Sequence, residues 1–92
     1  MIHSDEWKLN GDILHFKMQN HKSLGQLKAL QKEDIDEDKD WEGYTKNYRE
    51  RAKLLIKEMT DEKFDEMEFY PIENLVTAWG TKARRGFRKP EQ

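Results

Sequence analysis

The sequence predicts a mainly helical α+β fold, in which an N-terminal β-hairpin packs on three or four short helices. Two patterns indicate this class: apolar residues alternate around an Asn-Gly pair near the start, and they then recur at three- and four-residue steps. The length of 92 residues allows one small domain. Only 35% of the residues are hydrophobic and 39% are charged, so we expect the ten aromatic side chains to supply most of a small core.

The hairpin is predicted by Asn10-Gly11, a favoured pair for a two-residue turn because both positions need a positive φ. A loop of this length fixes the register of residues 5–9 against 12–18, and cross-strand partners share a face. The register pairs Leu9 with Asp12, Trp7 with Leu14, Asp5 with Phe16, and His3 with Met18. One face should therefore be apolar and covered by helices: Trp7, Leu9, Leu14, Phe16 and Met18. Ile13 is the one apolar residue expected on the opposite face.

The first helix is expected to begin at Ser23, which has the N-cap position of a capping box with Gln26, and to end near Lys32. From Trp41 the helical period returns and continues as far as Met59.

Two further helices are predicted after this segment. Thr60 is placed to cap a short helix whose buried residues would include Phe64. Pro71 suits the first turn of a final helix, which we expect to stop at Gly80.

Charge is distributed unevenly along the chain. Residues 33–42 contain seven acids and a single base, Lys39, whereas residues 82–92 contain five bases and one acid, Glu91. Self-repulsion favours an extended, solvated segment in the first case. We therefore predict one α+β domain over residues 1–81, with an acidic connection at 33–42, followed by a basic flexible tail at 82–92.

Catalytic and metal-binding patterns are absent from the sequence. The chain has no cysteine, and His3, His15 and His21 have no second ligand at helical spacing, so we interpret them as isolated surface histidines. Because no Gly-rich phosphate loop or nucleophile elbow occurs either, we expect a protein that is not an enzyme and needs no cofactor.

Four alternating aspartates in the acidic connection invite comparison with a calcium-binding loop. Such a loop needs glycine at its sixth position and a bidentate glutamate at its twelfth. A loop starting at Asp34 has Lys39 at the sixth position, and one starting at Asp38 has Arg49 at the twelfth. We therefore interpret the segment as a solvated connection and expect no metal.

Two groups of residues are candidates for binding a partner. An aromatic stripe on the predicted second helix is either core that covers the hairpin face or an anchor for a partner protein, and core is the preferred interpretation. The basic tail is interpreted as disordered, or as a segment that orders against an acidic protein partner, in preference to a nucleic-acid contact. The candidate residues are Trp41, Tyr44, Tyr48, Arg84, Arg85, Phe87 and Arg88.

Three consecutive pieces of the chain resemble the tail assembly chaperones of long-tailed bacteriophages. The first is a basic amphipathic helix after Tyr48, the second is the run Thr60-Asp61-Glu62-Lys63-Phe64-Asp65-Glu66-Met67, and the third is the helix from Pro71 to Ala78-Trp79. The N-terminal strand pair and the capped helix after it are compatible with the family. The pronounced acidic stretch at residues 33–42 departs from the family pattern.

The resemblance implies a non-enzymatic role in virion assembly. Proteins of this family coat the tape measure protein, keep its long helix soluble and help to recruit tail tube subunits. It also implies protein partners, a homo-oligomer and a location in the host cytoplasm, and the sequence has no apolar run near the ~20 residues that would span a membrane.

Two other classes of function stay open from the sequence. The acidic stretch would let the protein mimic nucleic acid and inhibit a nucleic-acid-binding protein. Alternatively, the basic tail would serve a small nucleic-acid-binding regulator.

Overall fold

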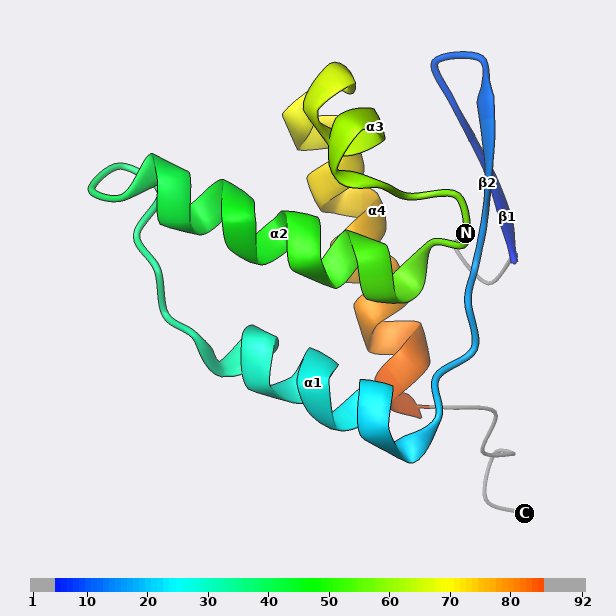
Figure 1. Cartoon of the computed structure of the whole chain (residues 1–92), viewed down its shortest axis with the longest axis horizontal. Coiled ribbons are helices and arrows are strands. Elements are labelled where there is room, and N and C mark those ends of the chain that lie inside the picture. The colour runs from blue at the N-terminus through cyan, green and yellow to red at the C-terminus, as the bar shows by residue number, and fades with distance from the viewer. Residues whose placement is uncertain (1–4, 86–92) are drawn as a thin grey trace.

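The computed structural model describes residues 5–85, which form a two-stranded antiparallel hairpin and four helices (Figure 1). This confirms the predicted mainly helical α+β class. The elements are β1 (Glu6–Leu9), β2 (Asp12–His15), α1 (His21–Lys32), α2 (Trp41–Leu55), α3 (Asp61–Glu66) and α4 (Phe69–Arg85). The three long helices α1, α2 and α4 contact one another, and the short helix α3 contacts α2.

The hairpin has the predicted turn and register. Asn10 and Gly11 have φ values of 52° and 85°, and the strand partners include Trp7 with Leu14. His3, the predicted partner of Met18, lies outside the described residues. Met18 does not lie on the buried face as predicted: its side chain is 64% exposed, because β2 ends at His15 and the chain then leaves the hairpin for α1.

A short extended segment after α2 joins the hairpin to the helices. Phe16 forms a β-bridge with Ile56, and the amide of Lys17 donates to the carbonyl of Leu55 at 2.8 Å. Helix α2 therefore ends at Leu55 and not at Met59 as predicted, since its next residue is extended to pair with the hairpin. Helical periodicity alone does not reveal this pairing partner.

The N-cap of α1 is Asn20 and not Ser23 as predicted. The side chain of Asn20 accepts from the Ser23 amide at 2.8 Å, and the Ser23 hydroxyl accepts from the Asn20 amide at 3.1 Å. Ser23 is thus the third residue of the capping box, and the helix starts at His21.

The last two helices begin near the predicted positions. Thr60 caps α3 by accepting from the Lys63 amide at 3.1 Å, and Pro71 lies in the first turn of α4. Gly80 does not stop α4, which continues to Arg85. A Cβ at Gly80 would lie 2.7 Å from Nε2 of Gln31, so glycine lets the α1 side chain approach this helix closely.

The core of the described chain is mainly aliphatic. It consists of Leu14, Phe16, Leu27, Ala52, Leu55, Ile56, Met59, Phe64, Ile72, Leu75, Val76, Trp79 and Ala83. Only three of these residues are aromatic, so the prediction that aromatic side chains supply most of the core is wrong. Trp79 of α4 is fully buried and meets Phe16 edge-to-face at 5.6 Å between ring centroids. This contact places α4 under the apolar face of the hairpin.

Candidate partner-binding surface

Five aromatic side chains from two helices form one continuous group, which we call the aromatic cluster. Trp41, Tyr44 and Tyr48 come from α2, and Phe69 and Tyr70 come from the first turn of α4. The ring centroids of Trp41 and Phe69 are 5.0 Å apart, and those of Trp41 and Tyr70 are 6.4 Å apart. The cluster thus joins the N-terminal ends of α2 and α4.

The aromatic cluster is open to solvent on one side. Trp41 is 46% exposed and Tyr70 is 55% exposed, whereas Tyr44, Tyr48 and Phe69 are half-buried. The interpretation of the α2 stripe as core over the hairpin is therefore wrong, because α4 covers the hairpin face. The reason is positional: the N-terminal end of α2 lies away from the hairpin, on the far side of α4 (Figure 1).

Two glutamates, Glu37 and Glu73, border the aromatic cluster, and we call them its acidic rim. The Tyr44 hydroxyl donates to Oε2 of Glu73, and the Tyr70 hydroxyl donates to Oε2 of Glu37 at 3.0 Å. The hydrogen bond to Glu73 raises the pKa of Tyr44 above its ordinary value, and the one to Glu37 does the same for the pKa of Tyr70. The surface therefore combines exposed aromatic rings with an acidic rim.

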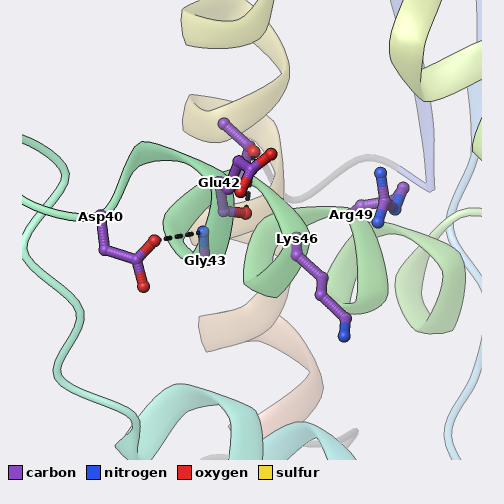
Figure 2. A pocket seen from close by; sticks show the side chains of 6 residues that line it. Asp40, Glu42, Gly43, Lys46 and Arg49 are labelled. Carbon is purple, nitrogen blue, oxygen red and sulfur yellow. Dashed lines mark hydrogen bonds between the residues drawn. The ribbon is translucent and has the colours of Figure 1, made fainter.

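The beginning of α2 is capped from the acidic connection. Oδ1 of Asp40 accepts from the Gly43 amide at 2.9 Å, and both residues help to line an open hollow of about 450 Å³. Figure 2 shows the other charged side chains of this hollow, Glu42, Lys46 and Arg49, spread along the helix and not directed at one point. The hollow thus has no convergent set of groups for catalysis.

Several acids of the connection make local hydrogen bonds. Oε1 of Glu33 accepts from Nδ2 of Asn47 at 2.9 Å, and Oδ1 of Asp36 accepts from the Asp38 amide at 2.8 Å. Within residues 5–85, no group of three or more histidine or acidic side chains is arranged to hold a metal ion.

His15 is not isolated, in contrast to the sequence interpretation. Its amide donates to Oε1 of Glu58 at 2.8 Å, its Nδ1 meets the other oxygen of Glu58, and its Nε2 lies 3.2 Å from Glu6. The hydrogen bond to Glu58 raises the pKa of His15. Burial works to raise the pKa of Glu58, but the bonds from His15 outweigh it and the pKa is lowered. Glu58 lies 43 positions from His15, so local spacing gives no sign of the pair.

The basic residues at the end of α4 fall into two groups. Arg84 and Arg85 are exposed and, with Lys28 and Thr81, line a hollow of about 340 Å³ between α1 and α4. Lys82 instead pairs with Asp5 of the hairpin side. Helix α4 thus extends four residues into the segment predicted as a flexible tail. The other two candidates, Phe87 and Arg88, lie outside the described residues.

Among the described helices, none is long and apolar enough to cross a membrane. Comparison of the chain with protein-family models, with curated proteins and with solved structures found no match.

Proposed function

We propose that this chain is a non-enzymatic, protein-binding assembly factor that binds the tape measure protein of a long-tailed phage and assists tail tube assembly in the host cytoplasm. The observation that carries the proposal is the exposed pair Trp41 and Tyr70, which lie side by side within an acidic rim. Exposed aromatic side chains that lie next to each other are typical anchors of protein interfaces.

The chemistry of the surface favours an amphipathic helix as its ligand. The apolar stripe of such a helix would lie on Trp41 and Tyr70, whose rings are large and lose little conformational freedom on binding. Lysine or arginine residues beside the stripe would face Glu37 and Glu73. A long helix that exposes an apolar stripe is poorly soluble by itself, so covering that stripe is a chaperone's task.

The family resemblance gives the proposal its biological setting. Its three sequence pieces correspond to parts of α2, α3 and α4, which are consecutive in the chain and packed together. The aromatic cluster lies where α2 and α4 begin, directly before the first and the third of these pieces, and none of its five residues belongs to a piece.

Co-expression with a tape measure protein tests the proposal. We expect the tape measure protein to be insoluble alone and soluble with this chain, and the double variant Trp41→Ala/Tyr70→Ala to abolish the rescue. The matched control is Ile13→Ala/Met18→Ala, which removes two equally exposed apolar side chains on the hairpin side and should keep full activity. A tape measure protein that stays insoluble with the wild-type chain would overturn the proposal.

The two alternative functions give different results with the same purified protein. A nucleic-acid mimic would bind a basic protein in a salt-sensitive manner and would not bind DNA. A nucleic-acid-binding regulator would retard DNA in a gel-shift assay, and deletion of residues 82–92 would abolish this binding. We expect neither result, because the exposed aromatic pair takes part in neither mechanism.

A further inference from the structure

The two carboxylates of the acidic rim are not paired with a cation. Glu37 and Glu73 are both half-buried, and neither is among the ion pairs of residues 5–85. Lys39, the one base of the acidic connection, is not among these ion pairs either. A carboxylate that is partly withdrawn from water loses hydration, and a cation or hydrogen bonds must compensate for that loss. The acidic rim therefore offers a place for a positive charge that the described chain does not supply.

Glu37 differs from the other acids of the acidic connection. It is the only one of the seven that is not exposed, and its Oε2 accepts a hydrogen bond from the hydroxyl of Tyr70 at 3.0 Å. This hydrogen bond is the main cause that raises the pKa of Tyr70. Burial raises that pKa further, and so do the negative charges of Glu37, Glu73 and Asp38. The acidic connection thus brings a carboxylate to the aromatic cluster, and Glu73 adds a second one from α4, three positions after Tyr70 and on the same side of the helix.

The exposed rings of the aromatic cluster have no cation over them. Within the same cluster, the guanidinium of Arg51 lies over the ring of Tyr48, with 4.4 Å from Cζ to the ring centroid. Trp41 and Tyr70 are more exposed than Tyr48, and no basic side chain of the described chain lies over either ring. The face of an aromatic ring attracts a cation, most strongly where water is partly excluded. Tyr70 thus combines an exposed ring with carboxylates beside it.

We propose that Tyr70, Glu37 and Glu73 form a guanidinium-binding site, which takes an arginine side chain located beside the apolar stripe of the partner helix. The inference rests on the proposed function and names the side chain by which the aromatic cluster recognises its ligand. A guanidinium is planar, so it can lie on an aromatic ring while its N–H groups donate to carboxylates at its edge. The ammonium of lysine is a strongly hydrated point charge without such a plane, so we expect the site to prefer arginine.

Other occupants fit these groups less well. An apolar side chain over Tyr70 would bury the two carboxylates further and leave them without a cation. A phosphate or another anion would be repelled by the same carboxylates. A divalent metal ion needs several ligands that converge on one point, and residues 5–85 contain no such group of acidic or histidine side chains. Charge complementarity therefore selects an organic cation, and the exposed aromatic ring selects a planar one.

Three helical peptides test the inference by fluorescence anisotropy with the full chain. Each has ~20 residues, a leucine stripe and an outer face of glutamine, and the positions on both sides of the stripe are all arginine, all lysine or all citrulline. Citrulline has the shape of arginine without its charge, and the three peptides present the same apolar stripe. The wild-type protein should bind the arginine peptide at least about tenfold more tightly than either of the others.

Removal of the rim charges should abolish this preference. Glu37→Gln/Glu73→Gln keeps side-chain oxygens that can accept from both tyrosine hydroxyls, so it should stay folded and bind the arginine and citrulline peptides with similar affinity. The matched control, Asp34→Asn/Glu62→Gln, removes two exposed carboxylates that make no ion pair in the described chain and should keep the wild-type preference. Far-UV circular dichroism establishes that both variants are folded.

The possible results distinguish a failure of this inference from a failure of the proposed function. Equal binding of the arginine and lysine peptides, or of all three peptides, would overturn the inference alone, since a helix would still bind through its apolar stripe. So would a Glu37→Gln/Glu73→Gln variant that keeps the wild-type preference. If none of the peptides binds, the inference is wrong together with the proposal that the aromatic cluster binds an amphipathic helix. A clear arginine preference in a protein that leaves the tape measure protein insoluble would support the inference and contradict the proposed function.

Discussion

Trp79 is the largest side chain of the buried core, and its replacement by phenylalanine tests how that core is stabilised. The side chain is fully buried, and its ring meets Phe16 edge-to-face. Its indole Nε1 is also buried and has no hydrogen-bond acceptor among the described residues. Trp79 therefore stabilises the fold by filling space and by its ring contact with Phe16, whereas burial of its unpaired N–H group lowers the stability.

The expected free-energy changes follow from these facts. Trp79→Ala should destabilise the protein by about 3–5 kcal/mol, the usual range for truncating a buried aromatic side chain. Trp79→Phe keeps a ring against Phe16 and leaves a smaller void, whose cost should be under about 1.5 kcal/mol. The substitution also removes a buried, unpaired donor, and this should raise the free energy of unfolding by about 1–3 kcal/mol. We therefore expect Trp79→Phe to lie within about 1 kcal/mol of the wild type, since these two terms largely cancel.

Urea denaturation followed by far-UV circular dichroism measures both variants without relying on tryptophan fluorescence. The reasoning requires Trp79→Phe to keep most of the stability that Trp79→Ala loses. If the phenylalanine variant is as unstable as the alanine variant, then the indole N–H makes a hydrogen bond in solution and the core is not held by packing alone.

Three other perturbations have clear expected results. The ion pair of His15 and Glu58 should stabilise the fold most between about pH 4.5 and about pH 6.5, the ordinary pKa values of the two groups. The contribution of the pair is lost as the pH rises through the raised pKa of His15, and also as the pH falls through the lowered pKa of Glu58. Urea titrations at several pH values should show a flatter dependence of stability on pH for Glu58→Gln than for the wild type. An unchanged pH profile in this variant would contradict the stabilising role of the pair. Gly25→Ala should raise the free energy of unfolding by about 0.5–1 kcal/mol, because the position is inside α1 and a Cβ there meets nothing within 4 Å. Gly43→Ala should instead lower the thermal midpoint, because a Cβ there collides with the capping carboxylate of Asp40, and loss of an N-cap costs about 1 kcal/mol; a gain in stability like that of Gly25→Ala would contradict the role of this cap.

The local chemistry of the chain determined the hairpin and the positions of the helices. Asn10-Gly11 adopts the positive φ values that a two-residue turn needs, so the register of the strands follows from two residues. The cap at Thr60 and the position of Pro71 depend equally on neighbours only a few residues away. Such features are predictable because the interacting groups are close in the sequence.

The end of each long helix and the site itself depended on contacts between distant segments. Helix α2 stops at Leu55 because the next residue pairs with the hairpin, and α4 passes Gly80 because its last turns pack beside α1. The spacing of the aromatic residues on α2 predicted a buried stripe, but it did not predict that this stripe packs on Phe69 and Tyr70 of α4.

Only the tertiary structure decided that the hairpin face is covered by α4 and that Trp41 meets Phe69 and Tyr70 at the surface. The sequence by itself determined the helical period, the turn and the uneven charge. The three-dimensional packing decided which side of each helix is buried. A helix can carry apolar residues on more than one side, and the elements packed against it determine which of these sides is covered.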